Sequence, residues 1–439
     1  MESTPRPTRL PGSPEGRGGR ALAVRLLTVG LAGGVLGCAA NPVYGPVGSG
    51  SGSGGTPVGA GTGGAGGGSQ TAAGGRGVYA APSCQPTPRA GTQIATPNPI
   101  VSVGRPVKAS AGVTNPEKIV DGLYDHSGMS VAVAMLPAWI AIELAAGPER
   151  LLLTWADVGW TDYNTPASGG SPADYTVATS GDSTNGVDGT WETVATVAGN
   201  PVREREHRFP FAGKNWVKIA FSAAVNTAAN ATVSIDEIAL YDVSAAGTDL
   251  PADSWFFMGD SITVNAFRRQ FGPSTSFSGL VAAARPAFSP AMLDGGIGGE
   301  LSAMGVGHLA DWLALNPDIR NVGLLYGTND SWGDKQGAAV TTFEANMNTM
   351  VDMVLASGRV PILARIPYST QAPTTLPMFN GVIDRISTAN GLPCGPDLYA
   401  WFRDHPEEIS ADGVHPNDVG YRSMNRLWAN AMLGRYLSN

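Results

Sequence analysis

The sequence predicts two folded domains: an antiparallel β-sandwich over residues 98–246, then a three-layer α/β domain over residues 253–439. Its 439 residues exceed what one ordinary core supports. In the first region, short β-branched and aromatic runs are separated by turn residues, which is typical of a sandwich. In the second, strand-like runs alternate with amphipathic helical patterns, which indicates a parallel sheet flanked by helices.

The first 37 residues have the layout of an export signal. Arginines precede an apolar stretch from Leu26 to Leu36, which is too short to span a membrane. The stretch ends in Val35-Leu36-Gly37-Cys38, which resembles the bacterial lipobox. This resemblance implies a lipid-anchored protein of the cell envelope, diacylated at Cys38. A soluble signal peptide with a chance cysteine is the alternative.

Residues 38–97 are expected to form a flexible tether. Between Tyr44 and Arg76 the chain is almost entirely Gly, Ser, Thr, Ala and Pro, with too little apolar surface to offset the entropy of ordering. Two cysteines follow Cys38, namely Cys84 and Cys394. An exported protein sits where disulfides persist, but the sequence leaves open whether these two pair.

The formal net charge of -8 comes from scattered acidic residues, with no long basic run. Nothing in this pattern attracts a polyphosphate backbone, so nucleic acid is not expected as a partner.

Strands are expected in the first domain at Trp139–Leu144 and Trp216–Phe221. Together with Asp121-Gly122, Tyr175-Thr176-Val177 and Ile235-Asp236-Glu237-Ile238, their order resembles the discoidin, or coagulation-factor type C, domain, which also occurs as a carbohydrate-binding module. The resemblance implies a jelly-roll sandwich that binds ligands through loops at one end. It also implies a structural calcium near Asp121-Gly122.

Three aromatic residues of this domain have two open interpretations. Trp155, Trp160 and Tyr163 form either a sugar-stacking surface or ordinary packing. The role of the domain is open in the same way, since it either holds a polymer near the α/β domain or shapes the wall of its cleft.

Buried strands of the α/β domain are predicted at Trp255–Met258, Val322–Tyr326 and Val360–Ile366, and helices at Ala338–Ala356 and Val419–Leu437. After the first strand comes Gly259-Asp260-Ser261-Ile262, so Ser261 lies at a strand-to-helix turn. Open α/β sheets bind ligands at this end of the strands, and a helix N-terminus there stabilises negative charge.

A base and an acid for this serine are expected near the C-terminus. Asp412 and His415 lie three positions apart on what reads as a loop before the last helix. A nucleophilic serine needs an imidazole to take its proton and a carboxylate to hold that imidazole in the right tautomer.

Two further blocks lie between them, Gly295–Glu300 and Tyr326–Asp330. Glycines let a substrate oxygen approach backbone N–H groups, and the Asn329 side chain offers another donor. Both are what an oxyanion hole requires.

The four blocks, in this order, resemble the SGNH/GDSL hydrolases, and the resemblance implies a flavodoxin-like α/β fold. It implies Ser261 as nucleophile, His415 as general base and Asp412 as its orienting acid. The oxyanion donors are then the N–H groups of Ser261 and Gly299 with the Asn329 amide, and Gly298 is an alternative to Gly299. Asp260 and Asp330 match positions that brace the loops.

The remaining histidines, His126, His207, His308 and His405, are expected to be structural or surface residues. No Cys, His and Asp cluster has metal-ligand spacing, so catalysis is predicted to need no metal or other cofactor.

The function that fits best is an esterase that removes acetyl or other short acyl groups from a polysaccharide. The segments Gly259–Thr263 and Ile297–Glu300 look most like the carbohydrate-acetylesterase branch of the family. The alternatives are a lysophospholipase or thioesterase of the same family, and an inactive tethered carbohydrate-binding lipoprotein.

Overall fold

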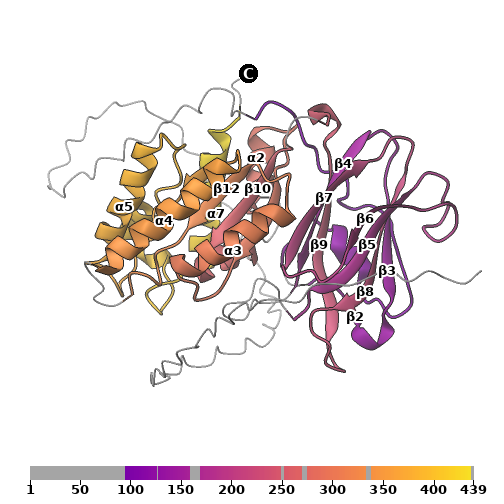
Figure 1. Cartoon of the computed structure of the whole chain (residues 1–439), viewed down its shortest axis with the longest axis horizontal. Helices are drawn as coiled ribbons and strands as arrows, with labels where there is room; N and C mark the ends of the chain where they lie inside the picture. Colours follow the sequence, from indigo (N-terminus) through magenta and orange to yellow (C-terminus); the bar gives the residue numbers. More distant parts are fainter. Residues whose placement is uncertain are drawn as a thin grey trace, which may run out of the picture. The chain divides into compact units, whose positions relative to one another are not determined.

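The computed structural model describes residues 94–125, 127–158, 169–248, 252–268, 274–332 and 338–436 (Figure 1). The predicted signal peptide, Cys38, Cys84, His126, Trp160 and Tyr163 lie outside these residues. Cys394 is disulfide-bonded. None of the described helices combines the length and the apolar character needed to cross a bilayer.

The first domain is an antiparallel β-sandwich, as predicted. One sheet has the strand order β1-β3-β8-β5-β6 and the other β2-β9-β4-β7, and the pairings in both are antiparallel. The elements are β1 (Val107–Ala109), η1 (Pro116–Val120), β2 (Met129–Ala132), η2 (Val133–Met135), β3 (Ala138–Glu143), β4 (Arg150–Asp157), β5 (Pro172–Ser180), β6 (Glu192–Val197), β7 (Glu204–Pro210), β8 (Trp216–Ala224) and β9 (Thr232–Asp242).

The two sheets bury their apolar residues differently. In β8, the buried Val217, Ile219 and Phe221 alternate with the more exposed Lys218, Ala220 and Ser222, as expected for a sheet with one solvated face. In β4, the run from Leu151 to Asp157 is buried without alternation. The four-stranded sheet is therefore covered on both faces over this strand.

The second domain is a parallel sheet between helical layers, which confirms the predicted α/β architecture. Its strand order is β11-β10-β12-β13, so the second strand in sequence lies outside the first, as in doubly wound folds. The elements are η3 (Ser244–Ala246), β10 (Ser254–Gly259), α1 (Ser261–Arg268), α2 (Phe277–Ala284), β11 (Ala291–Gly296), α3 (Ser302–Leu315), β12 (Asn321–Leu325), α4 (Ala338–Ala356), β13 (Val360–Leu363), α5 (Leu376–Ala389), α6 (Leu398–Asp404), η4 (Pro406–Glu408) and α7 (Asp418–Leu433).

Successive residues of β10 serve opposite layers. Phe256 packs in a cluster with Trp312 of α3 and Met347 of α4, whereas Phe257 packs with Trp428 of α7 on the other face. This period of two is what a strand buried on both faces requires. Pro361 is tolerated in β13 because, among the described strands, β13 pairs with β12 alone.

The ordered fold begins before residue 98, where the tether was predicted to end. Ile94 is fully buried and bridges to Tyr436, and Asn98 bridges to Phe288. These residues enter the α/β domain before the chain continues into the sandwich.

Candidate active site

The predicted site residues gather at the carboxyl ends of three neighbouring strands. Gly259 of β10 lies opposite Gly296 of β11 and Leu325 of β12. The chain leaves each strand directly into one of the predicted blocks, so Ser261, residues 297–300 and residues 326–330 share one edge of the sheet.

Ser261 is the first residue of α1, and its side chain is partly exposed. The turn before it requires glycine, because a Cβ on Gly259 would overlap the carbonyl oxygen of Leu325. Asp260 Oδ1 accepts the Ile262 N–H at 2.9 Å, which satisfies one of the N–H groups at the start of α1.

The structure brings Ser261, His415 and Asp412 into one hydrogen-bonded chain. Ser261 Oγ lies 2.8 Å from His415 Nε2, and His415 Nδ1 lies 2.7 Å from Asp412 Oδ2. This is the nucleophile, base and orienting acid arrangement that acyl transfer needs.

Asp412 is held as a carboxylate by its own loop. Its Oδ1 accepts the Ser410 hydroxyl at 2.7 Å and the backbone N–H groups of Val414 and His415 at 2.9 and 3.0 Å. Burial raises the pKa of Asp412, but the hydrogen bonds from Ser410, His415 and these amides outweigh it and hold the pKa well below its ordinary value. The negative charge that orients His415 is therefore kept into the acidic range.

A loop after β13, which sequence reasoning missed, braces the Asp412 turn. The Ser369 hydroxyl donates to the Gly413 carbonyl at 2.8 Å, and Gln371 Nε2 donates to the Asp412 carbonyl at 3.2 Å. Gly413 has a φ of 72°, where glycine is favoured.

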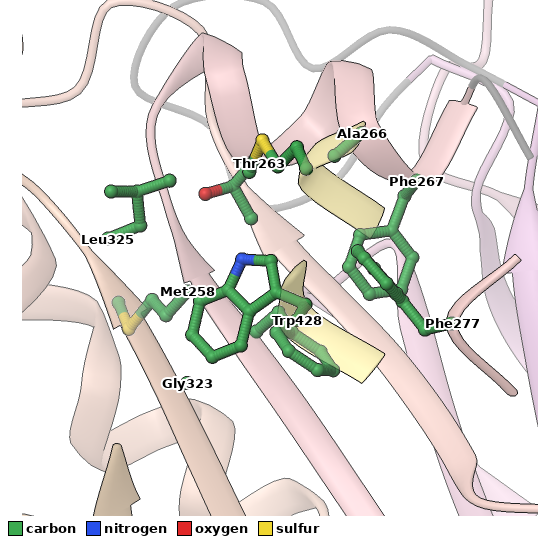
Figure 2. A pocket seen from close by; sticks show the side chains of 10 residues that line it. Met258, Thr263, Ala266, Phe267, Phe277, Gly323, Leu325 and Trp428 are labelled. Carbon is green, nitrogen blue, oxygen red and sulfur yellow. The ribbon is translucent and has the colours of Figure 1, made fainter. Parts of the chain in front are cut away.

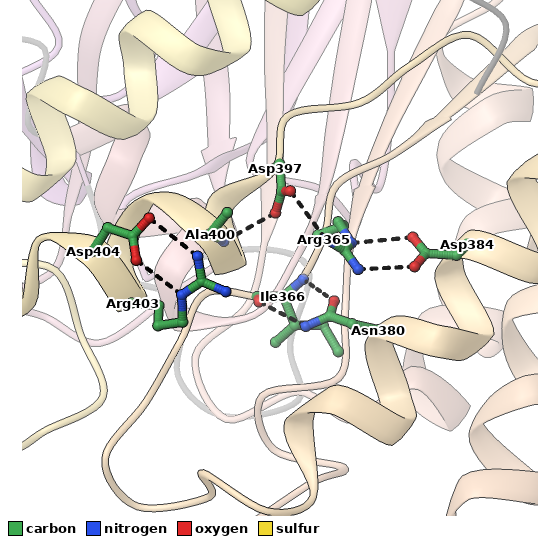
Figure 3. A network of polar contacts seen from close by, with 8 residues as sticks. All are labelled: Arg365, Ile366, Asn380, Asp384, Asp397, Ala400, Arg403 and Asp404. Atoms are coloured by element: carbon green, nitrogen blue, oxygen red, sulfur yellow. Dashed lines mark hydrogen bonds and ion pairs between the residues drawn. The ribbon is translucent and has the colours of Figure 1, made fainter. Parts of the chain in front are cut away.

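This loop is anchored in turn by the network around Arg365 (Figure 3). The guanidinium forms a two-pronged contact with Asp384 of α5, at 3.1 and 2.8 Å, and pairs with Asp397 at 3.0 Å. The next residue, Ile366, exchanges backbone hydrogen bonds with the Asn380 amide at 2.7 and 3.1 Å. Single charged residues with distant partners give no local sequence signal, so none of these was predicted.

The two predicted oxyanion blocks are tied together by Glu300. Asn329 Nδ2 donates to the Glu300 carbonyl at 2.9 Å, while the fully buried Glu300 carboxylate accepts the Tyr326 hydroxyl at 2.7 Å and contacts His308 Nδ1 at 2.7 Å. The side-chain amide of Asn329 is thus oriented by the neighbouring block. Glu300 was part of a predicted block, but this role was missed.

The positions of Gly299 and Gly298 differ in whether their backbone conformation favours glycine. Gly299 has a φ of 75°, so its backbone conformation favours glycine, whereas Gly298 has ordinary backbone angles and open space where a Cβ would lie. Asp330 accepts the N–H and the hydroxyl of Ser302 at the start of α3, at 3.1 and 2.6 Å, which fits the bracing role expected for it.

Asp260 is fully buried beneath Ser261. Burial raises the pKa of Asp260 to about 7, while the Ile262 N–H and the nearby His415 oppose the rise. This carboxyl therefore changes charge near neutral pH, close to the imidazole.

An apolar space beside α1 is lined by Met258, Thr263, Phe267, Leu325, Trp428 and their neighbours (Figure 2). It has no room for a water molecule. It is part of the packed core under β10 and does not extend the site inward.

One sugar-stacking interpretation is wrong. Trp155 is 2% exposed, and its indole N–H donates to the Tyr175 hydroxyl at 3.1 Å inside the sandwich core. It is a packing residue, because it lies with Leu151 and Leu153 in the apolar core between the two sheets.

The described histidines outside the site have structural contacts. His207 Nε2 lies 2.8 Å from the Tyr175 hydroxyl, and His405 stacks on Trp401 with ring centroids 4.0 Å apart. His308 pairs with Glu300, as given above.

The region expected to hold calcium has a buried acidic group. Glu237 Oε2 accepts the Gly122 N–H at 3.3 Å, and its Oε1 is buried without a hydrogen-bond partner. Burial raises the pKa of Glu237 well above its ordinary value, and the charge of Asp121 raises it further. A cation here would relieve both effects. Among the described residues, however, no group of three or more His, Cys, Asp or Glu side chains is arranged to hold a metal ion, so the calcium stays a prediction.

One family model matches most of the α/β domain. Residues 257–423 match the GDSL-like Lipase/Acylhydrolase family. The chain is similar to the solved structure of a lipase/acylhydrolase from Enterococcus faecalis, with 24% identity over 42% of this chain and 98% of that chain and a TM-score of 0.35.

Two further solved structures are similar to parts of the chain. For the acetylxylan esterase Axe2 from Geobacillus stearothermophilus, identity is 19% over 42% of this chain and 94% of that chain, with a TM-score of 0.36. For a chitosan-binding module of a chitosanase/glucanase from Paenibacillus sp. IK-5, it is 19% over 33% of this chain and 98% of that chain, with a TM-score of 0.25. No curated protein matches the chain.

Proposed function

We propose, from the premise that the α/β domain belongs to the GDSL/SGNH acylhydrolases, that this protein is a serine esterase that removes acetyl groups from a carbohydrate. The observation that carries the proposal is the hydrogen-bonded chain from Ser261 through His415 to Asp412, at 2.8 and 2.7 Å.

In the proposed reaction, Ser261 Oγ attacks the ester carbonyl carbon while His415 Nε2 takes its proton. Asp412 stabilises the imidazolium through Nδ1–H, and the oxyanion accepts hydrogen bonds from the N–H groups of Ser261 and Gly299 and from the Asn329 amide. The alcohol then leaves with the proton from His415. Water, activated by the same imidazole, releases the acid from the acyl-serine and restores the enzyme.

A small acyl group is supported by the surroundings of Ser261. The side chains of His415 and Asp412 are 34% and 50% exposed, so the reacting atoms lie on an open surface. The apolar space lined by Met258, Thr263 and Trp428 is closed even to a water molecule, so this space cannot take a long acyl chain. An open site suits a small acyl group carried by a bulky alcohol.

The carbohydrate part of the proposal is supported by Trp332, which is 48% exposed. Trp332 lies three residues after Asn329. Of the large apolar side chains that are exposed among the described residues, it alone is aromatic. Its backbone is fixed, because the preceding Ser331 is fully buried and donates its N–H to the Gly327 carbonyl at 2.9 Å. Aromatic faces pack against pyranose rings, and we infer from its exposure and its distance in sequence from Asn329 that Trp332 binds the sugar.

The test is hydrolysis of aryl esters from acetate to octanoate, together with acetate release from acetylated xylan. We expect the highest kcat/KM on acetate and no activity in Ser261→Ala. A rate that rises with chain length would favour the lysophospholipase or thioesterase alternative. Hydrolysis by folded Ser261→Ala would overturn the mechanism, and a wild-type protein without any activity would favour the binding lipoprotein.

Trp332 is tested separately. Trp332→Ala should raise KM for acetylated xylo-oligosaccharides about tenfold and leave the hydrolysis of ethyl acetate unchanged, since ethyl acetate has no ring to stack; the factor corresponds to about 1.4 kcal/mol. The exposed Val187→Ala, in the sandwich, is the matched control. Equal KM values for wild type and Trp332→Ala on the oligosaccharide would remove Trp332 from the substrate site.

The location of the protein is proposed on the sequence alone. We propose export and lipid anchoring at Cys38, with the tether holding the enzyme at the cell envelope. Cys38→Ser should move the protein from the membrane fraction to the soluble fraction, and an unchanged distribution would exclude the anchor.

A further inference from the structure

We propose that Arg203 and Glu204, at the start of strand β7, are positioning residues for the oxyanion loop, defined as residues 297–300. The β-sandwich is then part of the catalytic apparatus. This inference rests on the esterase function proposed above.

The contact is a buried charge network between β7 and β11. The N–H of Asp294 donates to Glu204 Oε2 at 2.6 Å, and Asp294 Oδ2 pairs with Arg203 Nη2 at 3.1 Å. Arg203 Nη1 also donates to the Gly296 carbonyl at 3.5 Å. The side chains of Arg203, Glu204 and Asp294 are 2%, 4% and 0% exposed, so water cannot replace these partners.

Burial and charge attraction oppose each other in this network. Burial and the charge of Asp294 raise the pKa of Glu204 well above its ordinary value, and Arg203 opposes the rise. Burial lowers the pKa of Arg203, but Asp294 and the neighbouring carboxylates raise it above its ordinary value, so the guanidinium stays protonated. Burial raises the pKa of Asp294, and Arg203 opposes this. A buried ion pair gives little net stability, but an arginine fork fixes the direction of the groups that it contacts.

The oxyanion loop leaves β11 directly from the atoms that this network holds. Asp294 Oδ1 accepts the Gly296 N–H at 2.7 Å, and the next residue, Ile297, donates its N–H to the Gly259 carbonyl at 2.9 Å. Gly296 lies close against the backbone of α1, because a Cβ there would overlap the backbone nitrogen of Val264. A shift of Asp294 is thus passed both to Gly299 and to the turn before Ser261.

Further contacts of β7 are made with β10 and with the segment before β12. Glu206 of β7 accepts the Ser254 hydroxyl at 2.9 Å and the Asp318 N–H at 2.6 Å. Arg208 pairs with Asp318 at 3.0 Å. β7 therefore contacts β10, β11 and the segment before β12, and holds these three parts in place relative to one another.

The test compares Arg203→Met and Arg203→Lys with wild type, using kcat and KM on 4-nitrophenyl acetate at 25 °C. Misplacing a reacting group by about 1 Å costs on the order of 10²-fold. We expect kcat to fall roughly 10- to 100-fold in Arg203→Met with little change in KM, and to recover in part in Arg203→Lys. Lys214→Met is the matched control, because Lys214 pairs with Glu192 on the surface of the same sandwich.

A second readout separates positioning from stability. A boronic acid that forms a tetrahedral adduct with Ser261 should bind more weakly to Arg203→Met by the factor that kcat/KM loses. If Arg203→Met does not fold, Glu204→Gln replaces it, since it keeps the size of the side chain. A lower melting temperature with unchanged kcat and inhibitor binding would overturn the inference. The proposed function would survive that result, because it depends on the activity of wild type and its loss in Ser261→Ala.

Discussion

Gly327, the second residue after β12, is the position where one methyl group should damage both the fold and the site. Its φ is 121°, where side chains are strained, and a Cβ there would overlap Ile366 Cδ1 and lie 3.1 Å from Phe343 Cζ. Gly327 lies two residues before Asn329, so movement that relieves the clash displaces the proposed oxyanion donor. Gly327→Ala should therefore lower both stability and kcat.

The expected loss of stability has two parts. A side chain in a sparsely populated backbone region costs about 1–3 kcal/mol, and overpacking a filled core costs about 1–3 kcal/mol more. Gly358→Ala is the matched control. Gly358 has a φ of 76°, but nothing lies within 4 Å of the added Cβ, so this variant measures backbone strain without the clash. We expect about 2–6 kcal/mol for Gly327→Ala and about 1–2 kcal/mol for Gly358→Ala.

Ile366→Val tests the cause of the clash, because it removes the Cδ1 atom that the new Cβ would overlap. Alone it should cost about 0.5–1.5 kcal/mol. Combined with Gly327→Ala it should cost at least about 1 kcal/mol less than the sum of the single changes. Urea unfolding gives these free energies, and kcat on an aryl acetate gives the functional loss. Additive losses, or equal losses for the two glycine variants, would refute the steric argument.

Burial raises the pKa of Glu206 to about 8 from 4.5, so the folded state binds this proton more tightly than the unfolded chain does. The stability that proton binding by Glu206 contributes is complete below pH 4.5 and is lost as the pH rises through 8. The melting temperature of Glu206→Gln should therefore fall less than that of wild type between these pH values. Parallel curves of melting temperature against pH for the two proteins would contradict this. Asn329→Ala should lower kcat roughly 10²- to 10³-fold in a folded protein, and a wild-type kcat would exclude it from the oxyanion hole. Calcium should raise the melting temperature of EDTA-treated wild type but not of Glu237→Ala, without changing kcat; equal shifts in both proteins would exclude a site at Glu237.

The site could be predicted where chemistry is local in sequence. Ser261 follows a buried strand directly, and Asp412 and His415 share one loop, so a few neighbouring residues define each turn. The supports could not be found this way. Arg365 meets Asp384 and Asp397 across helices, and nothing beside Arg365 in the sequence announces those partners.

The sequence around Trp155 already contains a pattern that predicts its burial. The run Leu151-Leu152-Leu153-Thr154-Trp155-Ala156 does not alternate, and a strand of this kind is buried on both faces. An aromatic residue within it has no path to solvent. The same run also predicts that something covers the outer face of the sandwich.

That cover is the α/β domain, and it changes how the role of the sandwich has to be tested. Leu152 and Tyr241 of the sandwich share a buried cluster with Ala291 of β11, while Val202 of the sandwich lies in the core cluster of the α/β domain. If the sandwich only brought polymer to Ser261, each domain would have its own closed core, and removing the sandwich would leave the core of the α/β domain intact. Cutting this chain between the domains opens both cores and removes Arg203 from Asp294. Deletion of residues 98–246 would therefore confuse loss of targeting with loss of folding, and point changes on β7 are the informative experiment.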